Sequence, residues 1–159
     1  TSFYNDNREP DKIKKSKIKF NNKILHQSKL LNYFLNKSSL PKVEKEINDL
    51  LKKIKKNKKY EFSTKDIILV ESLKSDGVKI SKKYENLYDY KSKVPPEINS
   101  MIINGESGLV LLKLVEIIGN DELESLDLES VGFVVGIMNE LKIINLRNEI
   151  LIKVLPLKV

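Results

Sequence analysis

The chain of 159 residues contains no cysteine, no tryptophan and no alanine. Without cysteine, disulfide bonds, thiolate metal sites and cysteine nucleophiles are excluded. Arginine is scarce as well, since 27 of the 29 basic residues are lysine. Lysine, asparagine and isoleucine are abundant instead, which is the composition expected of an AT-rich genome. We therefore interpret part of the net charge of +7 as codon bias and not as selection for an anionic partner.

The sequence also lacks a long hydrophobic run. No uninterrupted apolar stretch approaches the roughly 20 residues of a membrane-spanning helix. The most hydrophobic segment, residues 109–118, is interrupted by Lys113 and Glu116. The sequence begins at Thr1 and shows no signal peptide, so a targeting segment was either removed or never present. These absences predict a soluble protein, for which a cytoplasmic location is favoured and a secreted or periplasmic one stays open.

The charge divides the chain into two unlike parts. Residues 1–94 carry 24 Lys and Arg against 12 Asp and Glu, a net charge of +12, whereas residues 95–159 carry 5 against 10, a net charge of −5. Pro95 and Pro96 mark the boundary, because consecutive prolines end one helix and can begin the next. We therefore expect an extended or disordered basic tail over 1–22, a basic helical segment over 23–94, and a compact apolar helical bundle over 95–159. The last two are expected to form one continuous domain.

Apolar residues recur at helical spacing through most of the chain beyond the tail. The clearest helix begins near Ser39 and Pro41, a capping residue and a residue suited to the first turn, and ends in a lysine-rich turn. Other helices are predicted over 23–36, from residue 63 or 64 to just before Gly77, and over 97–103, 107–118, 127–141 and 146–155. Residues 78–93 are predicted to be a short helix or an ordered loop. Gly132 and Gly136 predict close contact between two packed helices.

The predicted fold class is therefore all-α, with an extended N-terminal tail. Two architectures fit the pattern: a multi-helix bundle, or a short array of helical hairpins like an α-solenoid. The second is suggested by a spacing of close to 20 residues per helix in the C-terminal part. One and a half hairpins do not establish a repeat, so both stay open.

Residues suited to catalysis or metal binding do not form a recognisable set. His26 is the only histidine, and we interpret it as an ordinary residue of a helix face. No Gly-x-Ser-x-Gly or comparable motif accompanies it. The acidic segment 121–129 lacks the glycine turn and the ligand spacing of a calcium loop. We predict no catalytic residue, no cofactor and no metal ligand, and we expect the chain not to be an enzyme.

One lysine cluster is suited to binding anions. Six lysines in eight positions, followed by Tyr60 and Phe62, suit phosphate backbones or anionic lipid headgroups. The alternative is a solvated helix end in a lysine-rich proteome. Sequence-specific recognition of bases usually needs arginine, and the chain has only two. The six lysines are Lys52, Lys53, Lys55, Lys56, Lys58 and Lys59.

These observations favour a non-catalytic helical interaction or scaffold module that binds another macromolecule or itself, and the pattern fits the C-terminal part of a larger protein. A protein partner or a homo-oligomer is the favoured assembly. Phe3, Tyr4 and Phe20 are candidate partner contacts. The alternative is a basic accessory protein that binds nucleic acid or a ribonucleoprotein through its lysine-rich helix ends.

Overall fold

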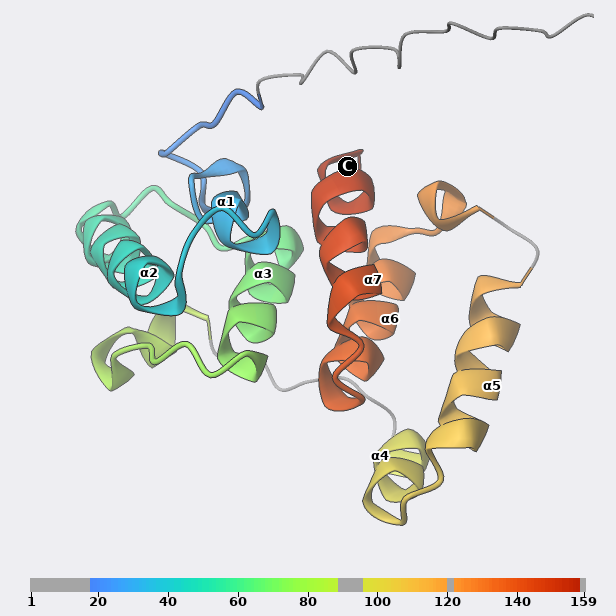
Figure 1. Cartoon of the computed structure of the whole chain (residues 1–159). Helices are drawn as coiled ribbons and strands as arrows, with labels where there is room; N and C mark the ends of the chain where they lie inside the picture. Colours follow the sequence, from blue (N-terminus) through green and yellow to red (C-terminus); the bar gives the residue numbers. More distant parts are fainter. Residues whose placement is uncertain (1–17, 89–95, 120–121, 158–159) are drawn as a thin grey trace, which may run out of the picture.

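The computed structural model describes residues 18–88, 96–119 and 122–157. Within these ranges every regular element is helical and no strand occurs, which confirms the predicted all-α class (Figure 1). The tail residues Phe3 and Tyr4 lie outside the described ranges. No described helix is both long enough and apolar enough to span a bilayer.

Seven α-helices and five other helical elements follow one another along these residues. The α-helices are α1 (Leu31–Phe34), α2 (Leu40–Lys56), α3 (Thr64–Ser75), α4 (Pro96–Ile103), α5 (Ser107–Ile118), α6 (Leu128–Glu140) and α7 (Ile144–Glu149). The 3₁₀ turns are η1 (Leu25–Gln27), η2 (Lys82–Leu87), η3 (Leu123–Ser125) and η5 (Leu155–Leu157), and a π-helical stretch, η4 (Ile150–Val154), continues α7.

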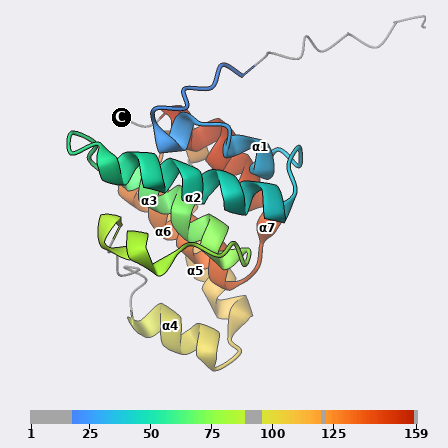
Figure 2. The same cartoon turned by 90° about the vertical axis from the view of Figure 1, so that its left-hand side faces the viewer.

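The helices form a central group with two flanks. α6 and α7 lie in the middle, with α1, α2 and α3 on one side and α4 and α5 at the opposite edge (Figure 1). α2 crosses in front of α3 in the view turned by 90°, and α4 lies at the far end of the molecule from α1 (Figure 2). α5 is thus a peripheral helix.

α3 begins and ends through local signals that the sequence carries. The Ser63 hydroxyl accepts the Asp66 N–H at 3.2 Å, and the Asp66 carboxylate accepts the Ser63 N–H at 3.2 Å, which is a reciprocal capping box. At the other end Gly77 has a φ of 89°, its N–H donates to Lys74, and the Val78 N–H donates to the carbonyl of Leu73. This is a Schellman motif. The predicted ends of the helix are confirmed.

The predicted helix over 23–36 is wrong, because the chain breaks at Ser28. η1 and α1 occupy parts of that range, and Ser28 between them is extended, with φ −79° and ψ 177°. Its hydroxyl donates to the carbonyl of Leu25 at 2.7 Å. A serine side chain that bonds the nearby backbone competes with helical hydrogen bonding. The predicted last helix also differs, since it begins at Ile144 instead of residue 146 and becomes π-helical after Glu149.

One cluster of buried apolar side chains includes residues from both sides of the double proline. α3 and α6 pack against each other in it. A Cβ atom on Gly132 would lie 3.2 Å from Cδ1 of Ile68, so the glycine permits the close approach of α6 to α3. The close contact predicted for this glycine therefore joins the C-terminal part to the basic N-terminal part.

Candidate interaction surface

α5 exposes apolar side chains on its outer side. Among its described side chains only Val110 and Leu114 are buried, and these lie one turn apart on one face. At 100° per residue, the opposite side of the helix is centred near Leu112. The exposed aliphatic side chains are Leu109 (48% exposed), Leu111 (43%), Leu112 (61%) and Val115 (64%). We call these four residues the α5 face. Within the region 95–159, for which a compact apolar bundle was predicted, α5 therefore leaves part of its aliphatic surface exposed.

The surroundings of the α5 face are open, and α5 itself has two charged residues. Ile103, at the end of α4, is 83% exposed. A Cβ atom on Gly108 would meet nothing within 4 Å, so the start of α5 is open as well. Lys113 and Glu116 are the charged residues of the helix, and Lys113 donates to Glu116 at 3.3 Å. Figure 1 shows α5 at the edge of the molecule, with no described helix beyond it.

The six predicted lysines lie together at the C-terminal end of α2 and in the turn after it, and all six are exposed. The Lys55 ammonium donates to the carbonyl of Lys83 at 3.1 Å and lies 5.9 Å from the ring centroid of Tyr84. The Lys83 ammonium lies 5.0 Å from the same centroid. η2 therefore adds cations to the lysine cluster, and the lysine-lysine-tyrosine sequence at 82–84 was the signal that could have indicated it. Phe20 is partly buried against the core.

A groove of about 770 Å³ runs along α3 and α6. Its walls include Ile67 and Phe133, and two glycines of α6, Gly132 and Gly136, also line it. Lys142 at its end donates to the carbonyl of Ser75 at 2.8 Å. The volume falls within the range of ligand pockets. Charged side chains, among them Glu71, Lys74 and Glu129, line the groove beside the apolar ones, and this mixed lining does not select a particular ligand.

His26 is a member of a buried polar network, which corrects its interpretation as an ordinary helix-face residue. Its Nδ1 lies 2.7 Å from Oδ1 of Asp66, and its backbone N–H donates to the same oxygen at 3.0 Å. The Tyr60 hydroxyl donates to the other carboxylate oxygen at 2.9 Å and accepts the N–H of Leu25 at 2.9 Å. Asp66 is 1% exposed. The network fixes η1 against the start of α3.

The network shifts two pKa values in opposite directions. Burial acts to raise the pKa of Asp66, but the hydrogen bonds from His26, the Ser63 N–H and Tyr60 outweigh it, so the pKa lies below its ordinary value. Burial, together with the neighbouring carboxylate, raises the pKa of Tyr60. Asp66 is therefore held as a carboxylate that accepts from all these donors.

The serine and histidine near Asp66 do not have the arrangement of a nucleophilic triad. The Ser63 hydroxyl lies 3.4 Å from Nδ1 of His26, the same ring nitrogen that contacts Asp66. In a triad the serine and the carboxylate contact opposite nitrogens of the ring. Here the Ser63 hydroxyl instead caps α3. Among the described residues no group of three or more potential metal ligands comes together.

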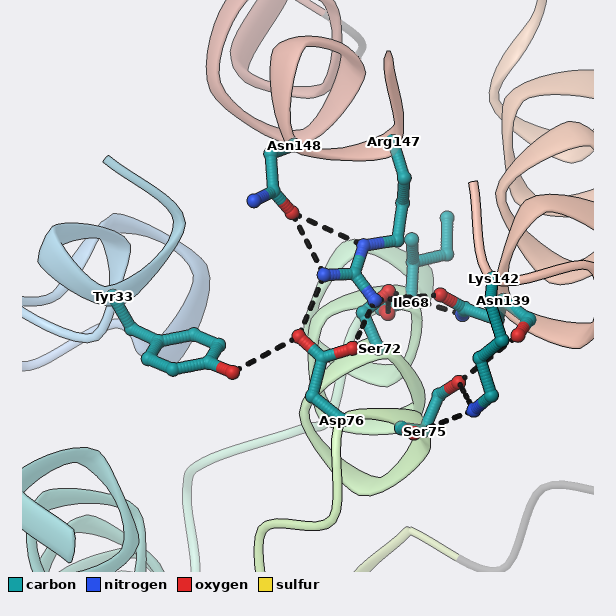
Figure 3. Close-up of polar contacts among 9 residues, drawn as sticks. All are labelled: Tyr33, Ile68, Ser72, Ser75, Asp76, Asn139, Lys142, Arg147 and Asn148. Atoms are coloured by element: carbon teal, nitrogen blue, oxygen red, sulfur yellow. Dashed lines mark hydrogen bonds and ion pairs between the residues drawn. The ribbon is translucent and has the colours of Figure 1, made fainter. Parts of the chain in front are cut away.

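A second buried network surrounds Arg147, which is 1% exposed (Figure 3). Its guanidinium binds Asp76 through two nitrogens and also donates to the side-chain oxygens of Asn139 at 3.1 Å and Asn148 at 2.8 Å. The Tyr33 hydroxyl donates to Asp76 at 3.1 Å. These residues come from α1, α6, α7 and the end of α3. Because the charges are paired inside the protein, we interpret this cluster as structural: it holds these elements together.

Comparison with known proteins found no matching family model, no matching curated protein and no matching solved structure.

Proposed function

We propose that this chain is a helical interaction module that binds another protein molecule through the α5 face. The observation that supports this most is the exposure of four aliphatic side chains on the side of α5 that points away from the core. Contiguous exposed apolar surface on a folded protein commonly marks an interaction site. Glu116 lies one turn after Leu112 on the same side of α5, and the Lys113 ammonium 3.3 Å away balances its charge.

The size of the surface sets the strength of the interaction. The α5 face and Ile103 together expose the equivalent of about three whole aliphatic side chains. Complete burial of one such side chain gains roughly 1.5–3 kcal/mol, so the gross gain is roughly 4–9 kcal/mol. Association costs roughly 4–15 kcal/mol because the two molecules lose translational and rotational freedom. The proposed contact is therefore a weak one unless the partner adds polar contacts around the rim.

Loss of specific capture would test the proposal. The chain, with a small affinity tag, is immobilised and exposed to an extract of its native cells, and the bound proteins are quantified. We expect the variant Leu112→Lys/Val115→Lys to lose partners that the wild type retains. The control variant Leu157→Lys changes a side chain that is 65% exposed at the other end of the C-terminal part. Equal capture by all three proteins would contradict the proposal.

A second candidate function is binding of a polyanion, such as single-stranded nucleic acid, through the lysine cluster. The observation that favours it is the convergence of the Lys55 and Lys83 ammonium groups on the ring of Tyr84. Tyr84 itself is buried, so its ring holds the two ammonium groups near each other and does not offer a stacking surface. The positive charge of the lysines is the feature that non-specific nucleic-acid binding depends on. The surrounding lysines of α2 extend the positive surface.

Salt dependence would test this second function. The affinity for a fluorescent single-stranded oligonucleotide is measured at two salt concentrations, about 50 and 200 mM. We expect affinity to fall steeply with salt, and Lys55→Gln/Lys83→Gln to reduce the slope of log K against log salt by about 1–2. The control is Lys113→Gln, which removes one positive charge from α5, away from the lysine cluster. Absence of binding at the lower salt concentration would exclude this function.

A further inference from the structure

We infer that the α5 face binds the same face of a second copy of this chain, in a two-fold symmetric pair whose α5 helices run in opposite directions. This inference rests on the proposed function, because it names the partner of that surface. Homo-oligomers with two-fold symmetry are the commonest assemblies of soluble proteins, and their interfaces must be self-complementary.

The spacing along α5 is self-complementary. Gly108, Leu112 and Val115 of α5 follow one another at intervals of four and three residues, which is the seam spacing of paired helices. Gly119, four residues further on, ends the helix with a φ of 59°. With the two-fold axis between Leu112 and Val115, the Leu112 side chain of each copy faces Val115 of the other. Glycine then faces glycine at both ends. Because small residues face each other at both ends of the contact, the two helices can approach closely there.

The electrostatics of α5 permit this contact. Lys113 and Glu116 already neutralise each other at 3.3 Å, so no unpaired charge of α5 has to be buried. Antiparallel helices also place the positive end of one helix dipole beside the negative end of the other. The whole chain carries a net charge of +7, which opposes association at long range. Association through the α5 face should therefore strengthen as salt is added, which is opposite to the effect of salt on polyanion binding.

The area predicts a weak dimer. The α5 faces of two copies expose the equivalent of about four whole aliphatic side chains, or about six when Ile103 of each copy is included. Burial of all six would cover on the order of 1,000 Å² at most, which is the lower bound for a specific interface. A dimer of this size forms in a concentration-dependent manner instead of being permanent.

The first test is the mass of the chain in solution, measured by sedimentation equilibrium from low micromolar to several hundred micromolar protein. We expect the wild type and Leu157→Lys to approach twice the mass of one chain, and more completely at higher salt. Leu112→Lys/Val115→Lys is expected to keep the mass of one chain at every concentration. Circular dichroism establishes that the variants retain their helix content. A wild type that keeps the mass of one chain throughout would overturn the inference.

Single cysteines test the geometry, because the natural chain contains none. A mixture of the variants Leu112→Cys and Val115→Cys should form mixed disulfide dimers faster than either variant forms dimers alone. Dimers that form faster in the Leu112→Cys variant alone would overturn the antiparallel arrangement.

Reactivity of the same cysteine separates this inference from the proposed function. If the wild type is monomeric and the cysteine of the Leu112→Cys variant reacts rapidly with a maleimide, the α5 face is open and a second copy is not its partner. The inference then falls while the proposed function stands. An unreactive cysteine in a monomeric chain would show that the face is covered within one molecule, and both would fall.

Discussion

Arg147 holds both carboxylate oxygens of Asp76, with Nη1 donating to Oδ1 at 2.6 Å and Nη2 donating to Oδ2 at 2.7 Å. The side chains are 1% and 6% exposed. This pair joins α7 to the residue that ends α3, although 71 residues separate them in the chain. The two-nitrogen geometry is one that lysine cannot reproduce. This buried ion pair therefore fixes the end of α3 against α7.

Removal of the guanidinium should destabilise the fold strongly. Arg147→Met would leave the carboxylate of Asp76 buried without its cation, and loss of one partner of a buried ion pair costs about 3–5 kcal/mol. Urea denaturation followed by circular dichroism measures the loss in free energy of unfolding.

Two further variants show whether the pair itself is responsible. Arg147→Met/Asp76→Asn should be more stable than Arg147→Met alone, because the unpaired charge is gone. Lys113→Met removes the exposed ion pair with Glu116 and should cost less than about 1 kcal/mol. A loss for Arg147→Met that is no larger than the loss for Lys113→Met would contradict the assigned role.

Acid should weaken the contribution of Asp66 to the stability of the fold. Because its pKa in the folded state lies below the ordinary value of 3.8, the carboxylate stabilises the fold fully above that value. The contribution is lost as the pH falls from about 4 through the lowered pKa. Asp66→Asn should cost about 1–3 kcal/mol near neutral pH, since several donors lose their ionised acceptor. Urea titrations at successive pH values measure the free energy of unfolding of both proteins. The difference between wild type and variant should become smaller below pH 4. A gap that is independent of pH would contradict this account.

Substitution of Gly77 should destabilise the end of α3. Its φ of 89° is a conformation that side-chain-bearing residues rarely adopt, and its N–H takes part in the Schellman motif. Gly77→Ala should therefore cost about 1 kcal/mol even though a Cβ atom there would meet nothing within 4 Å. Gly108→Ala is the matched control, because Gly108 has equally open surroundings but lies within α5, where alanine favours the helix. Thermal unfolding should shift downward for the first variant and not for the second.

The elements that could be predicted from the sequence are those whose signals are local. The start of α3 at Ser63, its end at Gly77, and the start of α6 at Asp127 each depend on hydrogen bonds within a few residues. The break at Ser28 was not predicted, because apolar spacing continues across it and only the competing hydroxyl ends the helix.

Contacts between distant segments could not be predicted from one sequence. His26 meets Asp66 across 40 positions, and Lys55 meets Lys83 across 28. The spacing of the residues marks neither contact, and the lysine-lysine-tyrosine sequence at 82–84 indicates a basic segment but not the segment that it meets. For α5 the sequence showed that the helix is apolar nearly all round, but not which side packs against the core. That choice depends on tertiary packing and determines which residues form the α5 face.

Substitutions on the two sides of α5 should therefore have opposite consequences for stability and binding. Leu114→Ala removes a side chain that is 3% exposed and should lower the free energy of unfolding by about 2–5 kcal/mol, through lost burial and the cavity left behind. Leu112→Ala, two positions away and 61% exposed, should change it by less than about 1 kcal/mol in the monomer. Urea denaturation at low protein concentration, where association is minimal, measures both. Leu112→Ala should nevertheless weaken association at high concentration, because the apolar surface that it removes is the surface proposed to bind. A monomer in which both substitutions are equally destabilising would show that α5 is buried on all sides, and the α5 face would not exist as a binding surface.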